Sequence, residues 1–535
     1  MDSGKEDLAA IDFARLSEPI PTFCVHVHIS VADDPAFARQ AVRSALKQSE
    51  KPYRVFITSD GDIARCVKLR DEVSLLSQSC DNRMAGLRAA LVSAYQMGAD
   101  YLVPVSVDAS LPQHALAGYA AFLIGHGKEG LPLLFGDEAE KLKIDGTNQY
   151  WLKPGWDRRM ILSQDYISAA CALPVRAAIA SMKQDEPALA ECIYELVLRM
   201  CLPTKAGTPV RHLPRVTMRT PPGHWQGGAK ENLRVVQQFV GGGAKVSPGP
   251  YGTVILRWQM PRPSPKVSVI VGTRDQADLL RTCVNGVLHK TRYPAIELII
   301  VDNDSHEAEA LDYMEKAKED PRVRIVRWPH PFNYSAINNC AAKSATGEYL
   351  CLLNNDIEVI DPEWLCELVR EAAQPQVGAV GARLLYPDRS IQHAGVAVGI
   401  GNAAGHAHRG LPEGKPGYFA QALITRGATA VTGACLLVSK CDFDAVGGLD
   451  EDDLAVAYND VDLCLKLHAR GFANIYAPTA TLIHHESKSR GLDFSPEQVE
   501  RYMRELNVIQ KRWGTKKWVD WWHHPRLDRS NEVFN

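Results

Sequence analysis

Long hydrophobic runs are missing from this sequence, since no stretch of the 535 residues approaches the roughly eighteen apolar residues of a membrane-spanning helix. The segment from Met1 to Asp7 also lacks the apolar core of a secretory signal. Neither sign of charge dominates, because 60 lysines and arginines face 63 aspartates and glutamates. No global field therefore favours nucleic acid or an anionic membrane. We expect a cytoplasmic protein with no transmembrane segment and no nucleic-acid partner.

Several common binding motifs are absent too. The thirteen cysteines show no CxxC pair, which in a chain of this length indicates reduced thiols rather than a disulfide framework. The segment Gly272-Thr-Arg-Asp275 contains neither GxGxxG nor GxxxxGK[ST], so neither a dinucleotide fold nor a P-loop is supported. A nucleotidyltransferase that makes sugar nucleotides would need a glycine-rich loop with a basic residue here. The one glycine in this segment therefore gives little support to a nucleotidyltransferase.

What the sequence does contain is apolar runs followed by acidic residues. The runs at 267–271 and 296–301 flank a helical stretch that ends near His289, a pattern typical of a parallel sheet buried on both faces. Asp275 follows the first run and Asp302 ends the second. In open α/β sheets such positions face the crevice at the carboxyl ends of the strands, where ligands bind. Taken singly, such aspartates are more often helix caps or turn residues.

An internal repeat indicates two copies of one α/β domain. Residues 33–62 align without gaps with residues 275–304, and the segment 100–108 falls over 348–356. In the first alignment, identical residues are found at Asp33, Arg39, Val42, Leu46, Pro52, Ile57, Asp60 and Asp62. Duplication explains this better than chance similarity between two ordinary strand-helix-strand units. We therefore predict an α/β protein with domains at 1–222 and 265–495, a linker at 223–264 and a C-terminal helical extension at 496–535.

Three further segments of the second copy carry candidate chemistry. The strand ending Asn354-Asn-Asp356 places a carboxylate at a sheet edge, where it can hold a hard divalent cation. Asp460 and Asp462 begin an amphipathic helix, and capping explains only part of this acidic cluster. His484 ends a later strand, where it could complete a metal site, although a lone histidine there is more often a surface residue.

Together these segments resemble glycosyltransferase family 2, which has the GT-A fold, and especially its bacterial branch that builds O-antigen and capsule chains, rhamnosyltransferases among them. The resemblance covers roughly residues 265–495, with the motifs in family order. The motifs are Val269-Ile-Val-Gly-Thr-Arg-Asp275, Ile300-Val-Asp-Asn-Asp-Ser305, Leu352-Leu-Asn-Asn-Asp356, Val431-Thr-Gly-Ala-Cys435, Val446-Gly-Gly-Leu-Asp-Glu451, Tyr458-Asn-Asp-Val-Asp-Leu463 and His484-His-Glu-Ser487. The resemblance implies two tandem GT-A-like, nucleotide-diphospho-sugar transferase (Rossmann-like) domains.

The resemblance also implies roles for individual residues. Asp460 resembles the catalytic base, and Asp356 and His484 resemble ligands of Mg²⁺ or Mn²⁺. The nucleotide-binding residues implied are Thr273, Asp275, Asp302, Asn303 and Asn354, with Asp302 on the nucleobase. The residues implied for the sugar and acceptor pocket are Gly433, Ala434, Cys435 and Asn459. Two positions depart from the family pattern, because Asn354 replaces the first aspartate of the DxD motif and Asn459 the first residue of the acidic pair.

The activity implied is an inverting, metal-dependent transfer of a sugar from a dTDP-, UDP- or GDP-linked donor to a glycan hydroxyl in bacterial surface polysaccharide synthesis. A lipid-linked acceptor would place the protein peripherally at the inner face of the plasma membrane. The alternative from another class is a non-catalytic glycan-binding or scaffold protein. Against it, the second copy retains its nucleotide, metal and base positions together.

The first copy is predicted to be a GT-A-like domain with weakened or absent catalysis. It keeps Asp108, but Ser106 replaces the start of the DxD motif, and the acidic pair aligns near Cys192-Ile193. The alternative, that both copies are catalytic, would assign a working site to Asp137 and Glu138.

Two other regions leave alternatives open. The histidine- and arginine-bearing insertion at 392–410 either covers donor or acceptor or is a solvated loop. The tryptophans between 513 and 522 would seat at a lipid interface, stack on sugar or, more commonly, pack a C-terminal arm onto its own domain.

Overall fold

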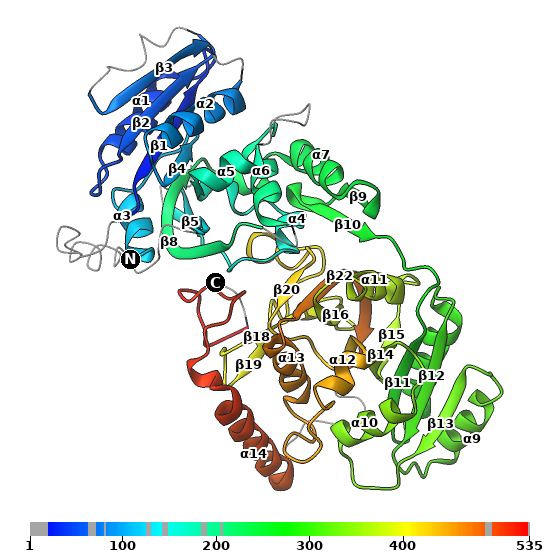
Figure 1. The fold of residues 1–535 in the computed structure, drawn as a ribbon. Helices are drawn as coiled ribbons and strands as arrows, with labels where there is room; N and C mark the ends of the chain where they lie inside the picture. The colour runs from blue at the N-terminus through cyan, green and yellow to red at the C-terminus, as the bar shows by residue number, and fades with distance from the viewer. Residues whose placement is uncertain are drawn as a thin grey trace. The chain divides into compact units, whose positions relative to one another are not determined.

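The computed structural model describes residues 20–61, 71–79, 82–124, 130–141, 148–182, 190–203, 207–486 and 495–532. The chain divides between Val240 and Gly241 into two compact units, here unit 1 and unit 2. Both are α/β, which confirms the predicted fold class (Figure 1). No helix in the described ranges is long and apolar enough to cross a membrane.

Unit 1 is built on one sheet with strand order β3-β2-β1-β4-β7-β5, and β6 and β8 both pair with β5. Its strands are β1 (Phe23–Ile29), β2 (Arg54–Ser59), β3 (Val73–Ser79), β4 (Tyr101–Val105), β5 (Leu133–Lys141), β6 (Asn148–Trp151), β7 (Cys171–Pro174) and β8 (Val210–Thr220). Its helices are α1 (Pro35–Leu46), α2 (Arg83–Gln96), α3 (Ala115–Phe122), α4 (Met160–Ser163), α5 (Val175–Ser181), α6 (Ile193–Cys201) and α7 (Ala229–Val240).

Unit 2 is built on a larger sheet with the order β13-β12-β11-β14-β21-β16-β22-β15, to which β17 and β20 are added. Its strands are β9 (Ala244–Pro248), β10 (Val254–Trp258), β11 (Val267–Thr273), β12 (Ile296–Asp302), β13 (Val323–Arg327), β14 (Tyr349–Asn354), β15 (Ile357–Val359), β16 (Val377–Leu385), β17 (Ile391–His393), β18 (Val396–Val398), β19 (Ala404–His406), β20 (Arg426–Ala428), β21 (Cys435–Ser439) and β22 (Ala473–His484). Its helices are α8 (Ala277–Asn285), α9 (Ala308–Ala317), α10 (Tyr334–Ser344), α11 (Trp364–Ala372), α12 (Lys440–Ala445), α13 (Asn459–Ala469) and α14 (Pro496–Trp513).

The two sheets repeat one topology. In unit 2, β11 pairs in parallel with β12 and β14, β21 is antiparallel to β14 and β16, and β22 is parallel to β16. In unit 1, β1 pairs in parallel with β2 and β4, β7 is antiparallel to β4 and β5, and β8 is parallel to β5. The shared order and directions agree with the internal repeat read from the sequence.

The segment 223–264, expected to be a linker, contains regular structure. Helix α7 closes unit 1, and the antiparallel hairpin β9–β10 opens unit 2. The hairpin is fixed to α11, because Arg257 Nε lies 3.2 Å from Glu367 Oε1 and Arg370 donates to Trp258 O at 2.6 Å. The part of the predicted linker that has no regular structure and joins two elements is therefore short, and it lies between Trp258 and the start of β11.

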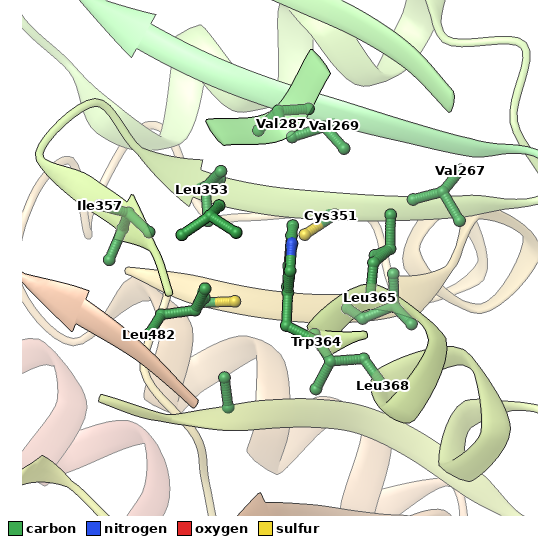
Figure 2. Packing of buried hydrophobic residues seen from close by; sticks show 14 of the residues in the cluster. Val267, Val269, Val287, Cys351, Leu353, Ile357, Trp364, Leu365, Leu368 and Leu482 are labelled. Carbon is green, nitrogen blue, oxygen red and sulfur yellow. The ribbon is translucent and has the colours of Figure 1, made fainter. Parts of the chain in front are cut away.

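The core of unit 2 lies on both faces of the sheet. On one face, α11 covers the central strands with Trp364, whose side chain is fully buried among Val269, Cys351 and Leu365 (Figure 2). The indole is also satisfied as a donor, since Nε1 lies 2.9 Å from Thr291 Oγ1. Removing a buried aromatic side chain of this size costs about 3–5 kcal/mol. This packing fixes the ends of the strands that carry the candidate site.

Helix α14 and the residues after it pack onto unit 2. Ser495 and Gln498 form a reciprocal capping box at its start, and Gly514 ends it in the left-handed conformation at φ 65°. The following segment, residues 515–532, is here the C-terminal arm. Its Asp520 accepts a hydrogen bond from Val398 N at 2.7 Å, and Trp522 is 8% exposed and packs against Gly427. The structure thus favours packing of the tryptophan-rich segment onto its own domain.

Candidate active site

A pocket of about 400 Å³ lies at the carboxyl ends of β11, β12 and β14 in unit 2. Thr273, Asp275, Asn303 and Asn354 line it, so four of the five residues predicted to bind nucleotide meet in one cavity. The parallel register brings them together, because Thr273 pairs with Asp302 in β12 and Gly272 with Asn354 in β14. Asn355 Nδ2 then lies 3.1 Å from Thr273 Oγ1 and joins the β11 and β14 ends.

Asp302, predicted to contact the nucleobase, is not among the residues that line this pocket. Its carboxylate is 1% exposed, accepts a hydrogen bond from Ser305 N at 2.9 Å and pairs with the Arg327 guanidinium. Asp302 therefore orders the β12–α9 loop from a buried position outside the pocket. Its neighbour Asn303 is the residue that reaches the pocket, with its amide nitrogen held by His330 O at 2.7 Å.

Asp275 joins the two loops at the pocket wall. Its Oδ1 accepts hydrogen bonds from Glu307 N at 2.9 Å and His306 N at 2.7 Å, and its own amide donates to Ser305 Oγ at 2.8 Å. The bond from Glu307 is the main cause that lowers the pKa of Asp275 below its ordinary value. The residue takes the left-handed conformation at φ 54° to make these contacts. It therefore fixes the shape of the pocket as well as lining it.

Asp356 and His484 form the predicted pair at the sheet edge. Strand β15 runs antiparallel to β22 with Ile357 opposite His484, which places the imidazole beside the carboxylate. His484 Nε2 lies 3.1 Å from Asp356 Oδ1 and 3.4 Å from the Asn354 side-chain amide. Both side chains are buried, at 4% exposed for Asp356 and 7% for His484.

These donors fit a divalent metal ion. A carboxylate oxygen and an imidazole nitrogen that converge on one point are the ligand types that Mn²⁺ accepts, and the carboxylate and amide oxygens suit Mg²⁺. His484 Nδ1 is buried with no hydrogen-bond partner in the described part of the chain. A proton on Nδ1 would leave Nε2, the nitrogen facing Asp356, as the lone-pair donor. The residues present therefore fit the Mg²⁺ or Mn²⁺ predicted from the sequence.

Asp460 lies at the start of α13 and is held by backbone amides. Its Oδ2 accepts from Gly433 N and its Oδ1 from Val461 N, both at 2.8 Å. Gly433 O in turn accepts from the Tyr334 hydroxyl at 2.7 Å, and Tyr334 lines the pocket. Next along the chain, Ala434 O accepts from Asn354 N at 3.0 Å. Short hydrogen-bonded steps through residues 433 and 434 thus connect Asp460 with the wall of the pocket and with the end of β14.

Three of the four residues predicted to form the sugar and acceptor pocket are buried. Cys435 is fully buried in β21 opposite Leu353, and Ala434 belongs to the hydrophobic core. Asn459 is 3% exposed and its amide donates to Val456 O at 3.1 Å. Of this set, Gly433 donates its backbone N–H to the Asp460 carboxylate.

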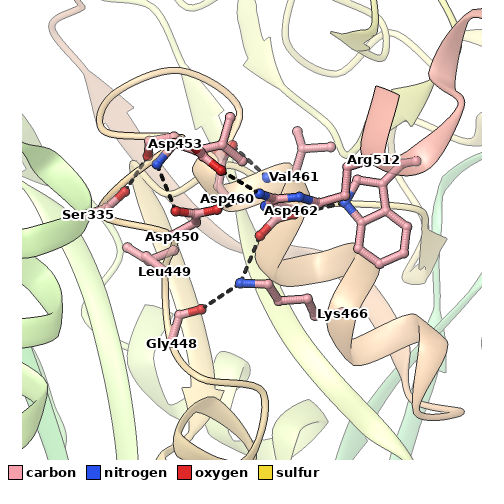
Figure 3. A network of polar contacts seen from close by, with 12 residues as sticks. Ser335, Gly448, Leu449, Asp450, Asp453, Asp460, Val461, Asp462, Lys466 and Arg512 are labelled. Carbon is pink, nitrogen blue, oxygen red and sulfur yellow. Dashed lines mark hydrogen bonds and ion pairs between the residues drawn. The ribbon is translucent and has the colours of Figure 1, made fainter. Parts of the chain in front are cut away.

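The acidic cluster contains two carboxylates with different surroundings, as Figure 3 shows. Asp462 is fully buried and lies 3.0 Å from Arg512 Nη1, 2.8 Å from Lys466 Nζ and 2.8 Å from Trp513 Nε1. Arg512 also reaches Asp450 at 2.7 Å. Asp462 is therefore committed to anchoring α14. Asp460 is half-buried and makes no ion pair among those found in the described residues, which leaves it as the candidate base.

The insertion at 392–410 is not a solvated loop, because its histidines are held within the fold, and none of its residues is among those that line the unit 2 pocket. His393 is fully buried, with Nδ1 2.8 Å from Ala382 O and Nε2 3.3 Å from Thr432 N. Burial lowers the pKa of His393 well below its ordinary value and that of His408 to about 3. His406 Nδ1 lies 2.8 Å from Gln392 O, and Arg409 pairs with Glu486 and Glu532 at 3.5 Å. These side chains stabilise the fold of unit 2.

In unit 1 the residues that align with the candidate site of unit 2 have different surroundings. Asp60 Oδ2 accepts from Ser30 Oγ at 2.7 Å and its Oδ1 from Val31 N at 2.8 Å. Ser106 and Asp108 line a separate pocket of about 430 Å³ within this unit. Strand β8, which corresponds to β22, ends at Thr220 rather than at a histidine. The histidine that ends β22 in unit 2 thus has no counterpart at the end of β8.

Asp137 and Glu138, considered for a second active site, are structural. Both are at most 1% exposed in β5. Glu138 pairs with the fully buried Lys153 at 2.7 Å, and Asp137 accepts from Lys153 N at 2.9 Å and lies 2.8 Å from His212 Nε2. Carboxylates held in this way form a polar core and do not face the unit 1 pocket, whose lining does not include them.

Some pocket residues were not anticipated from the sequence. Arg274, Tyr334, Gln498 and Arg501 line the unit 2 pocket, the last two from α14. The sequence predicted a helical extension from residue 496, but its local pattern holds no signal that this helix would meet the loop at 272–276, more than two hundred residues away.

Residues 268–397 match the family model described as glycosyl transferase family 2. Unit 2 therefore contains a glycosyltransferase family 2 domain. The uncharacterized protein y4gI of Sinorhizobium fredii is 34% identical over 523 residues, which cover 92% of this chain and 56% of the relative. The O-antigen biosynthesis protein RfbC of Myxococcus xanthus is 34% identical over 512 residues, covering 90% of this chain and 39% of the relative. The chain thus spans about half or less of the length of these relatives.

Among solved structures, the chain is similar to the mannosyltransferase PcManGT from Pyrobaculum calidifontis in complex with GDP-Man and Mn²⁺. It is 18% identical, with a TM-score of 0.36, and the match covers 54% of this chain and 72% of that chain. The matched residues 268–397 run from β11 into β18 and include Asp356, and they stop before Asp460, His484 and α14.

Proposed function

We propose that unit 2 transfers a sugar from a nucleoside-diphosphate donor to a hydroxyl of a glycan acceptor, with inversion at the anomeric carbon, in the synthesis of a bacterial surface polysaccharide. The observation that carries this proposal is that two residues lining the pocket lead to the other groups. Asn354 lies 3.4 Å from His484 of the Asp356–His484 pair, and Tyr334 donates to Gly433, whose amide donates to Asp460. Asp356, His484 and Asp460 are not themselves among the residues that line the pocket. The family 2 match and the name of the O-antigen relative support it.

In this proposal different residues bind the nucleotide, bind the metal ion and accept the proton. Thr273, Asn303 and Asn354 hold the nucleotide, and Asp356 with His484 holds Mg²⁺ or Mn²⁺. The metal ion, when bound, supplies positive charge that stabilises the departing diphosphate. Asp460 takes the proton of the acceptor hydroxyl while a bond forms from that oxygen to the anomeric carbon and the bond to the diphosphate breaks on the opposite face. The two backbone hydrogen bonds to Asp460 keep its carboxylate oriented for this transfer.

The donor nucleotide is dTDP, UDP or GDP, and the acceptor is a glycan, free or attached to a lipid carrier. A lipid-linked acceptor would bring the protein to the inner face of the plasma membrane. Unit 1, whose strand β8 ends at Thr220 rather than at a histidine, serves acceptor binding or packing and has weakened or no catalysis.

A donor screen tests the proposal. Purified protein is incubated with dTDP-, UDP- and GDP-sugars, with Mn²⁺ or with EDTA, and release of the nucleoside diphosphate is measured. We expect release from one donor class that depends on the metal. Binding of glycan without nucleotide binding in any combination would instead support the glycan-binding scaffold and refute the transferase.

A further inference from the structure

Helix α14 forms one wall of the donor pocket, although it lies outside residues 268–397 that match the family model. Gln498 and Arg501, one turn apart on this helix, line the same cavity as Thr273 and Asn354. The side chain of Arg501 is 26% exposed, so it lies at the mouth rather than in the core. A residue on α14 can therefore reach a molecule bound at the carboxyl ends of β11 and β14.

The charges around the cavity favour a diphosphate near Arg501. Arg274 and Arg501 are the two cations among its lining residues, and Asp275 and Glu307 are the two anions. Both anions are engaged by backbone amides, Asp275 with those of residues 306 and 307 and Glu307 with Gln276 N at 3.2 Å. Guanidinium groups bind phosphate oxygens through paired, charge-assisted hydrogen bonds.

Arg501 is held in place by its own helix. Its Nε lies 3.9 Å from Glu505 Oε1, and Glu505 is 3% exposed. Glu505 is fixed in turn, because its carboxylate accepts from Ala457 N at 2.6 Å and Val456 N at 3.2 Å. An arginine oriented by a rigid carboxylate loses less conformational freedom when it binds a ligand.

The same helix touches the loop that carries the candidate base. The Tyr502 hydroxyl, next to Arg501, lies 2.7 Å from the Tyr458 hydroxyl. Tyr458 takes the left-handed conformation at φ 60° and directly precedes Asn459 and Asp460. One helical turn of α14 thus contacts both the donor pocket and the start of α13.

Unit 1 shows the opposite arrangement at the matching helix. Helix α7 follows β8 as α14 follows β22, and it contributes Glu231 to the unit 1 pocket. Arg234, the sixth residue of α7 as Arg501 is the sixth of α14, pairs with Glu191 at 2.5 Å. The arginine at this helix position pairs with Glu191 in unit 1, whereas in unit 2 it lines the cavity.

We propose that Arg501, together with Gln498, binds the diphosphate of the donor, so that α14 is a functional wall of the active site as well as a packing element. This inference rests on the proposed function of unit 2. It assigns a donor-binding residue that the strand-end motifs do not include, and it makes the position of α14 a determinant of donor affinity.

The test is titration calorimetry of the full chain with UDP, GDP and dTDP in the presence of Mn²⁺. For the nucleotide that binds, we expect Arg501→Ala and Arg501→Gln to weaken binding by about tenfold or more, and Arg501→Lys to retain part of the affinity. The matched control is Arg504→Ala on the same helix, whose side chain is 63% exposed and pairs with Glu500, and which should bind like the wild type.

Thermal unfolding of the ligand-free variants separates a direct role from a structural one. Wild-type affinity in Arg501→Ala would overturn the inference. So would an equal loss in the alanine, glutamine and lysine variants together with lower melting temperatures, since that pattern means a disturbed helix. Absence of binding of all three nucleotides by the wild type would refute the proposed function itself, which is a distinct result.

Discussion

Replacement of Asp460 by asparagine separates its chemical role from its structural one. Asparagine has nearly the same shape, but it cannot accept a proton from the acceptor hydroxyl. A positioned general base contributes about 10²–10⁴ to the rate, or roughly 3–5 kcal/mol of barrier at ~1.4 kcal/mol per factor of ten. We therefore expect Asp460→Asn to lower kcat by two to four orders of magnitude while donor affinity stays close to the wild-type value.

The hydrogen bonds of Asp460 set the stability cost of this variant. The carboxylate accepts from Gly433 N and Val461 N, and asparagine offers one oxygen and one amide group in their place. One backbone N–H thus loses its acceptor at a half-buried site, at a cost of about 1–3 kcal/mol in the free energy of unfolding. The protein should remain folded at room temperature.

Asp462→Asn is the matched control two residues away. Its carboxylate is fully buried between Arg512 and Lys466, and breaking a buried ion pair costs about 3–5 kcal/mol. This variant should lose more stability than Asp460→Asn, and any activity it loses should follow the loss of folded protein. Nucleoside diphosphate release and urea denaturation measure the two effects. Undiminished turnover in Asp460→Asn would remove it from the role of base, and equal instability of the two variants would refute the assignment of Asp462 as the anchor.

Three further predictions concern the metal, helix α14 and pH. Asp356→Asn or His484→Gln should weaken Mn²⁺-dependent nucleotide binding by about tenfold or more without changing metal-free binding, as measured by calorimetry with and without EDTA. Arg512→Leu leaves the carboxylate of Asp462 without one of its two cations and should lower the free energy of unfolding by about 3 kcal/mol in urea titrations. His393 is buried in the neutral form with a lowered pKa, so its contribution to stability is complete above its unfolded pKa of about 6.5 and is lost as pH falls below it. His393→Gln should therefore flatten the dependence of unfolding free energy on pH between 7 and 5 by up to about 1.4 kcal/mol per unit.

Each of these predictions has a control in the chain. His485 and Glu358 form a second imidazole–carboxylate pair at 3.0 Å in the same two-strand segment, and their side chains are more exposed than those of His484 and Asp356. Their substitution by glutamine should leave metal dependence unchanged. Lys511→Leu and His468→Gln alter exposed side chains and should leave stability and its pH dependence near wild type. Equal effects in control and test variants would contradict the corresponding assignment.

The strand ends were predictable from the sequence because the signal is local. Continuous apolar runs that end in Thr273, Asp302 and Asn354 require a buried parallel sheet, and parallel strands bring their carboxyl ends to one edge. The repeat then supplied the topology of the first unit. The pairing of Asp356 with His484 followed from family order and agrees with the register of β15 and β22.

What the sequence could not supply depends on long-range pairing. The motif around Asp302 does not reveal that Arg327 claims its carboxylate, so the adjacent Asn303 reaches the pocket instead. Asp460 and Asp462 look equivalent at a helix start, and only the position of Arg512, fifty residues away, distinguishes them. Arg501 carried no motif at all. In each case the role of the residue depends on a side chain far away in the sequence that packs against it in the fold. Local sequence patterns do not predict such long-range contacts.

The C-terminal arm has a consequence for the kinetics of folding. The bond between Asp520 and Val398 joins residues 122 positions apart, and Trp522 closes a similar loop onto Gly427. Because closing long loops costs entropy before their contacts give anything back, such contacts tend to form late. We expect the sheet of unit 2 to assemble first and α14 to dock with the arm afterwards. The unit 2 pocket would then gain its last wall near the end of folding. A partial opening of the arm in the native protein would release that wall while the rest of the sheet stays protected from hydrogen exchange.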